Sequence, residues 1–199
     1  MKMKNKITIG LTGGIASGKS SVLKDFKRLG ARVLDCDRMA REVVRPGQPA
    51  LRKIRKAFGK EVLLKNGSLN RPAMAKIVFK SRPKRKKLEK IIHPEVVRLL
   101  KKRMACIPSG LVVADVPLLF ESGLERMFDK TLVVWTPLKT QLARLMDRSG
   151  MSKGEALSRI NAQWPLARKR KMADFTLDNS GFWADSRSQT VSLAKKWMN

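Results

Sequence analysis

Short apolar runs alternate with helical patterns along the 199 residues of this chain. The runs have the length of buried strands, and those at 7–11 and 111–116 are apolar at both parities, as in strands covered on both faces. We expect strands at 7–11, 31–34, 111–116, 131–135 and 175–177. The alternation of strands with helices predicts an α/β fold around a five-stranded parallel sheet.

Apolar residues at helical spacing fill most of the segments between these strands. The first such segment, 21–29, ends at Gly30, and Ser152 with Glu155 has the spacing of a capping box. Pro94 is expected to bend or break a long helix, because proline lacks the N–H that a helix uses. The expected helices are 21–29, 50–58, 72–80, 84–104, 137–147, one that begins at 152, and 184–198.

Residues 13–20 read Gly-Gly-Ile-Ala-Ser-Gly-Lys-Ser, which matches the phosphate-loop motif G-x-x-x-x-G-K-[ST]. The motif lies between the first strand and the first helix, where backbone N–H groups can wrap a triphosphate at the positive end of the helix. A side chain at Gly13 or Gly18 would obstruct the turn or the phosphate. Lys19 can reach the β- and γ-phosphates, and the Ser20 hydroxyl can ligate Mg²⁺. The sequence therefore predicts binding of a nucleoside triphosphate.

Three aspartates lie at the carboxyl ends of strands of the predicted sheet, at the edge where such sheets bind ligands. Asp37 lies just past the second strand, where its carboxylate can accept the proton of an acceptor hydroxyl; a structural role is the alternative. Asp35 has the position of a helix cap or loop acceptor. Asp115 has the position of a Walker B acid, within reach of Mg²⁺ through a water, and the same position suits a carboxylate that fixes a loop. Phosphoryl transfer uses groups of these kinds, so the pattern indicates an enzyme.

Two arginines and the only histidine are further candidates. Arg144 and Arg148 are one helical turn apart, so they can stack on adenine and clamp phosphates, or form a solvated basic stripe. His93 precedes a proline, where packing at a helix end is the alternative to an acid–base role.

The chain is strongly basic, with 44 lysines and arginines against 16 acids and a formal net charge of +28. Residues 38–103 hold 22 of the basic residues and four glutamates. Such a segment can be a solvated face, a site for a phosphate-rich small molecule, or a nucleic-acid surface. Phe58 and Phe79 are its only aromatics, which argues against base stacking, so nucleic acid is not expected as a partner.

The sequence favours a cytoplasmic enzyme. No apolar run approaches the ~20 residues of a membrane helix, so no membrane partner is expected. Residues 1–6 resemble the basic start of a signal peptide, but the apolar stretch that follows is part of the phosphate loop. Cys36 and Cys106 have no metal-binding spacing and are expected to be free thiols. Oligomeric state has no indicator in the sequence.

Several collinear motifs together resemble the dephospho-coenzyme A kinase family. They are residues 10–20, 34–44, 116–121 and 173–179, the pair His93-Pro94, the set Gln141, Arg144 and Arg148, and Gln163. They span nearly the whole chain, and other small phosphate-loop kinases lack the D-x-D-x-x-A-R and P-L-L-x-E pieces. Two departures, Cys36 for a usual Ala and Ser21 for a usual Thr, affect no role that the resemblance implies.

The resemblance implies that ATP phosphorylates the 3′-hydroxyl of the ribose of dephospho-CoA, with Mg²⁺, in the last step of coenzyme A synthesis. It implies a three-layer phosphate-loop kinase core at 1–37, 105–136 and 173–199. A helical acceptor-binding region would be at 38–104 and a lid at 137–172. Two other functions stay open: a kinase for another nucleoside or nucleotide, and a basic NTPase that binds nucleic acid through 82–103.

The resemblance also assigns roles to residues. Asp37 is the general base, Arg41 lies beside it at the acceptor, and Lys19 is the third catalytic residue. The ATP site comprises Gly14, Ala16, Ser17, Gly18, Lys19, Ser20, Ser21, Arg144 and Arg148. The acceptor site comprises Asp37, Arg41, His93, Leu118, Leu119 and Glu121. Ser20 would bind Mg²⁺; the position of Asp115, and not the resemblance, offers it as a second contact through a water.

Overall fold

The computed structural model describes residues 5–198. Residues 1–4, which carry most of the basic start noted above, and residue 199 lie outside the described part. The chain divides into two compact units. The first comprises Met1–Asp35 with Ile107–Asn199, and the second comprises Cys36–Cys106.

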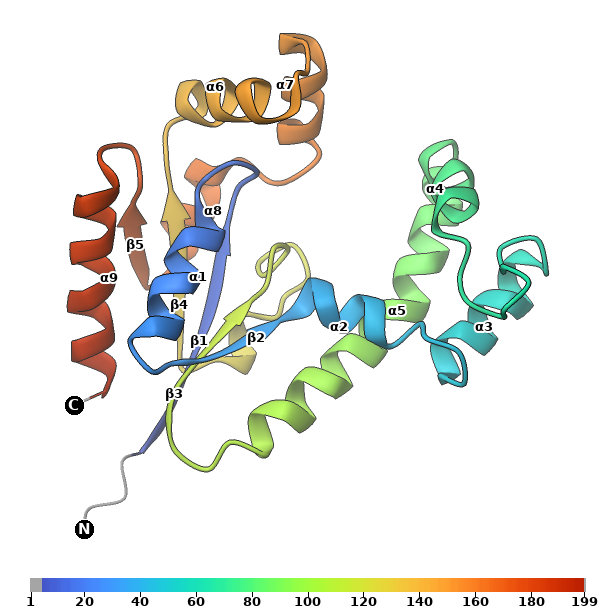
Figure 1. The fold of residues 1–199 in the computed structure, drawn as a ribbon, viewed down its shortest axis with the longest axis horizontal. Helices are drawn as coiled ribbons and strands as arrows, with labels where there is room; N and C mark the ends of the chain where they lie inside the picture. Colours follow the sequence, from blue (N-terminus) through green and yellow to red (C-terminus); the bar gives the residue numbers. More distant parts are fainter. Residues whose placement is uncertain (1–4, 199) are drawn as a thin grey trace. The chain divides into compact units, whose positions relative to one another are not determined.

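A sheet of five parallel strands forms the centre of the first unit (Figure 1). The strands are β1 (Lys6–Gly13), β2 (Arg32–Asp35), β3 (Gly110–Asp115), β4 (Lys130–Trp135) and β5 (Phe175–Asp178), in the order β2-β3-β1-β4-β5. The predicted α/β fold and all five predicted strands are confirmed. The two runs that are apolar at both parities form β1 and β3, which have neighbours on both sides.

Two helices cover one face of this sheet. α1 (Lys19–Arg28) and α9 (Trp183–Met198) pack against each other and against the strands. Ile9 and Leu11 of β1 are fully buried beneath them, and the ring of Phe26 stacks on that of Trp197 with centroids 6.0 Å apart. On the other face of β1, the ring of Phe128 lies so close to Gly10 that a Cβ there would approach it to 2.6 Å.

A repeated threonine–aspartate pair aligns the amino ends of three strands. The carboxylate of Asp129, just before β4, accepts from both the N–H and the hydroxyl of Thr8 at 2.7 Å. Asp174, just before β5, accepts in the same way from the N–H and hydroxyl of Thr131 at 2.8 and 2.7 Å. Because each aspartate directly precedes its strand, these bonds fix where β4 and β5 begin.

Three further helices of the first unit follow β4. They are α6 (Leu138–Ser149), α7 (Lys153–Asn161) and α8 (Leu166–Met172). The capping box predicted at Ser152 and Glu155 is present in full, with both reciprocal bonds. α8 was not predicted, because seven residues with four basic side chains give no clear apolar period.

Four helices make up most of the second unit. They are α2 (Cys36–Glu42), α3 (Pro49–Phe58), α4 (Arg71–Phe79) and α5 (Arg82–Ala105). Of the bend or break expected at Pro94, the break is wrong: α5 continues through the proline as one helix. Pro94 and Lys90, four residues earlier, are both exposed, so water can bind the carbonyl that proline leaves without a donor. Val96, Leu100 and Met104 anchor the helix beyond Pro94.

Within residues 5–198, none of the helices combines the length and the apolar character needed to cross a membrane.

Candidate active site

The phosphate loop connects β1 to α1 in the first unit. Gly18 precedes α1 in the left-handed region, at φ 86°, and Ala16 is also left-handed, at φ 59°. A left-handed residue other than glycine is strained, and such strain gathers at functional sites. The N–H of Ser17 donates to the carbonyl of Gly14 at 3.2 Å, which closes a turn within the loop. The loop and the first turn of α1 form an anion-binding arrangement.

Three glycines of the loop face side chains of the protein itself. A Cβ on Gly13 would lie 2.6 Å from Ser17 Oγ, one on Gly14 would collide with Gln141, and one on Gly18 would collide with Asn179. The sequence explained Gly13 and Gly18 by the turn and the phosphate alone. The structure adds a neighbour within the loop for Gly13, and neighbours from segments distant in sequence for Gly14 and Gly18.

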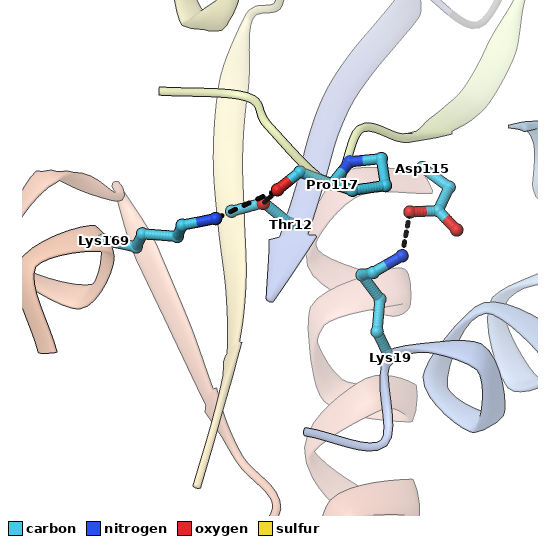
Figure 2. Close-up of polar contacts among 5 residues, drawn as sticks. All are labelled: Thr12, Lys19, Asp115, Pro117 and Lys169. Atoms are coloured by element: carbon cyan, nitrogen blue, oxygen red, sulfur yellow. Dashed lines mark hydrogen bonds and ion pairs between the residues drawn. The ribbon is translucent and has the colours of Figure 1, made fainter. Parts of the chain in front are cut away.

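Lys19 forms an ion pair with Asp115 at the end of β3 (Figure 2). Both side chains are mostly buried, with 17% and 15% of their surface exposed. Asp35 ends the neighbouring strand β2 and is the register partner of Asp115. The lysine therefore meets an acidic edge of the sheet.

This edge fits a magnesium ion held largely by substrate. The Ser20 hydroxyl and the carboxylates of Asp115 and Asp35 are oxygen donors, which Mg²⁺ prefers. Among residues 5–198 no group of three or more His, Cys, Asp or Glu side chains could hold a metal by itself. Phosphate oxygens and waters would complete the coordination of a Mg²⁺ here, as is usual for this ion.

A second polar cluster lies around the carbonyl of Pro117, two residues after β3. This carbonyl accepts from the hydroxyl of Thr12, at the end of β1, and from Lys169 Nζ, at 3.1 and 3.0 Å (Figure 2). Lys169, on α8, has no exposed surface and also pairs with Glu121 at 2.7 Å. Glu121 accepts from the N–H of Trp164 as well, at 3.2 Å. Sequence reasoning missed Lys169, because nothing distinguishes it within its basic run.

The cluster bears on three of the predicted acceptor residues. One carboxylate oxygen of Glu121, Oε1, is engaged by Lys169 and Trp164, whereas Oε2 is buried and has no hydrogen-bond partner among the described residues. Leu119 is fully buried, whereas Leu118 is 44% exposed. Of these three residues, Leu118 has the largest accessible surface to offer an acceptor, and 14% of the Glu121 side chain is also exposed.

The other predicted nucleotide residues lie on or near α1 and on α6. Ser17 is fully buried, so its contribution to a phosphate site is its backbone, while Ser20 is exposed and Ser21 half-buried. Arg144 is half-buried and Arg148 exposed on α6, one turn apart.

The predicted catalytic pair Asp37 and Arg41 lies in the second unit. Both are exposed on α2, one turn apart, whereas Cys36 and Met39 are buried. Asp37 comes two residues after the last residue of β2, because α2 follows that strand without a loop. His93 is exposed on α5.

Comparisons with known proteins agree over nearly the full length. The family model of dephospho-CoA kinase matches residues 7–185. The chain is 47% identical to a dephospho-CoA kinase of Bacillus licheniformis over 97% of this chain and 98% of the other, and 48% identical to that of Geobacillus kaustophilus over 96% of each.

Solved structures give the same result. A crystal structure from Thermus thermophilus superposes with a TM-score of 0.81 at 39% identity, covering 96% of this chain and 98% of the other. Dephospho-CoA kinase from Campylobacter jejuni superposes with a TM-score of 0.74 at 29% identity, covering 96% of both. A shikimate kinase from Acinetobacter baumannii, at 16% identity and a TM-score of 0.52, shares the fold. With the phosphate loop, its acidic partner at β3 and this agreement along the whole chain, the protein belongs to the dephospho-CoA kinase family.

Proposed function

We propose that this protein transfers the γ-phosphoryl group of ATP to the 3′-hydroxyl of the ribose of dephospho-CoA, giving CoA and ADP. Membership of the family supports the reaction and both substrates. The observation in the molecule that carries the proposal is the ion pair of Lys19 with Asp115, which joins the phosphate loop to the acidic carboxyl edge of the sheet. We further propose that it works in the cytoplasm.

The ATP site is assigned to the first unit. Amides of residues 14–21 surround the phosphates, and Lys19 neutralises charge that develops between the β- and γ-phosphates. Ser20 and Asp115 are the residues that would hold Mg²⁺, which would supply positive charge to offset that of the phosphates. Arg144 and Arg148 are assigned to the adenine and to the lid over the phosphates.

The acceptor chemistry is assigned to Asp37 and Arg41. Asp37 takes the proton of the 3′-hydroxyl as that oxygen bonds to the γ-phosphorus and the bond to ADP breaks. Arg41 lies one turn away and offers a positive charge to the anionic acceptor. His93 and Leu118 are assigned to the acceptor site, to which the basic surface of residues 38–103 draws the pyrophosphate.

A coupled ADP-release assay tests the proposal with dephospho-CoA, AMP, adenosine and a panel of other nucleosides. Adenosine and AMP carry the same hydroxyl without the pantetheine arm. Binding energy from the arm and the pyrophosphate positions the hydroxyl, so the truncated acceptors should be poorer by at least about 10²-fold in kcat/KM. Equal or better use of AMP or a nucleoside would assign the chain to another kinase specificity.

A further inference from the structure

One side chain from the carboxyl-terminal part of the chain holds the phosphate loop. Asn179 follows β5, and its Nδ2 donates to the carbonyl of Ser17 at 2.7 Å, across 162 residues of sequence. The asparagine is 4% exposed, and both residues belong to the first unit. A buried bond of this kind is costly to lose, because its groups are then left desolvated without a partner.

Asn179 is itself fixed from several directions. Its N–H donates to the carbonyl of Trp135 at 2.8 Å, and its Oδ1 accepts from the hydroxyl of Ser186 at 2.7 Å. Gln189 bonds to the neighbouring Asp178 rather than to Asn179: its side chain accepts from the N–H of Asp178 and donates to its carbonyl, each at 3.0 Å. The Ser17 carbonyl can only accept, so the amide nitrogen must be the atom that faces it.

The bond to Ser17 sets the direction of the next N–H of the loop. The Ser17–Gly18 peptide is trans, so its N–H points opposite to its carbonyl. Because the carbonyl is turned toward the buried Asn179, the N–H of Gly18 points away from the interior of this unit. Gly18 directly precedes α1, where N–H groups and the helix dipole together stabilise a phosphate.

The identity of residue 18 agrees with this contact. Gly18 has a left-handed backbone, and the place of its missing Cβ is filled by Asn179 Nδ2. The close approach of the amide therefore needs glycine at this position, for a reason separate from room for the phosphate.

We propose that Asn179 is a positioning residue of the kinase reaction, which holds the Ser17–Gly18 peptide so that the Gly18 N–H faces the triphosphate of ATP. The inference rests on the proposed function, because it needs ATP on the phosphate loop. Asn179 acts through Ser17 and requires no contact of its own with the nucleotide.

Two substitutions test this role, because they should weaken the binding of ATP and leave the binding of dephospho-CoA unchanged. Asn179→Ala removes the amide, and Asn179→Leu removes its hydrogen bonds while keeping a side chain of similar shape in the space. In both variants, checked for folding by circular dichroism, we expect the KM and the equilibrium Kd for ATP to rise by at least about tenfold. The KM for dephospho-CoA should stay within about twofold of wild type.

Gln189→Ala is the matched control. It removes the bonds to Asp178, in the same connection between β5 and α9, and leaves the bond from Asn179 to Ser17 in place. We expect a lower melting temperature and an unchanged KM for ATP. A loss of stability alone would therefore not reproduce the effect expected of the Asn179 variants.

Two outcomes would overturn the proposal: ATP affinity within twofold of wild type in the folded Asn179 variants, or the same loss of ATP affinity in Gln189→Ala. The equilibrium ATP measurement needs no acceptor. It therefore tests Asn179 even if wild-type protein fails to phosphorylate dephospho-CoA, which is the result that would refute the proposed function.

Discussion

At the scale of single residues, the phosphate-loop lysine has one partner in the protein and another in the proposed substrate. Its ammonium group pairs with Asp115 in surroundings that are mostly shielded from water. Charges attract each other more strongly where water is partly excluded. Asp115 keeps the Lys19 ammonium group at the edge of the sheet where charge develops. We expect the γ-phosphate of bound ATP to compete with Asp115 for this group.

Lys19→Ala should therefore remove transfer without unfolding the protein. Loss of one preorganised positive group at the developing charge costs about 10²–10³ in turnover. Lys24→Ala is the control, because it removes an exposed charge from the same helix. Steady-state ADP release measures both variants, and a Lys19→Ala enzyme that keeps more than about a tenth of wild-type turnover would contradict the role.

Asp37→Asn addresses the proton acceptor. Asparagine is nearly isosteric with aspartate and cannot take the proton, so turnover should fall by about 10²–10⁴ while ATP affinity stays within a few fold. Glu42→Gln on the same helix is the control; Glu42 is held by Arg103 at 2.7 and 2.8 Å, so its loss should lower stability more than turnover. If Asp37→Asn instead lost ATP binding and kept normal turnover at saturation, Asp37 would belong to the nucleotide site.

A functional residue can be predicted from sequence when the residues that define its role are close to it along the chain. Lys19 and Ser20 belong to a contiguous motif whose spacing is dictated by the phosphates, so sequence alone identifies them. Asn179 and Lys169 act through contacts with residues far away along the chain, and no sequence motif predicts such contacts. The ion pair between Glu121 and Lys169 could not be predicted from the sequence for the same reason.

At the scale of elements, strands were more predictable than short helices. The central strands β1, β3 and β4 contain compact apolar runs, because a central parallel strand is buried on both faces. α2 and α8 are seven residues long, which is too short for a helical period to stand out. α2 follows directly after β2, and α8 precedes β5. The helix does not break at Pro94, because the cost of proline in a helix depends on whether water reaches the freed carbonyl.

The threonine–aspartate pair between β4 and β5 predicts a pH-dependent stability. Hydrogen bonds from Thr131, above all from its hydroxyl, hold the pKa of Asp174 below its ordinary value of 3.8. A lowered pKa in the folded state stabilises the protein above about pH 4, and this stabilisation is lost as pH falls through the folded pKa. Thr131→Val should lower the free energy of unfolding by about 0.5–1 kcal/mol at pH 7, toward the lower end because Asp174 is open to solvent.

Urea unfolding of wild type and Thr131→Val between pH 7 and pH 2.5 measures this difference, which should shrink below about pH 4. Thr136→Val is the control, because the Thr136 hydroxyl is buried and has no hydrogen-bond partner among the described residues. That variant should show no such change with pH. A Thr131→Val difference that stays constant down to pH 2.5 would contradict the assigned cause of the lowered pKa.

At the scale of the whole molecule, the positive charge exceeds what one anionic acceptor requires. Half of the 44 lysines and arginines lie in residues 38–103, and the other half are spread over the rest of the chain. All five basic residues within 82–87 are exposed. Of the two aromatics in this region, Phe79 is 86% exposed, while Lys87 lies over the ring of Phe58 at 5.8 Å. The many positive charges attract phosphate groups, but a single exposed aromatic ring is too little for successive nucleobases to stack on.

We therefore expect the charge to give only non-specific, salt-sensitive binding to nucleic acid. Each phosphate contact releases counterions, so affinity should fall steeply as salt rises. Gel-shift titrations with two unrelated DNA duplexes should give equal shifts at about 20 mM salt and none at about 150 mM with micromolar protein. ADP release with dephospho-CoA at the higher salt should be the same with and without DNA, because the acceptor is held by its arm and its reacting hydroxyl as well as by charge. A shift that survives 150 mM salt and differs between the two duplexes would show a base-reading surface, and would assign the surplus charge to a nucleic-acid partner.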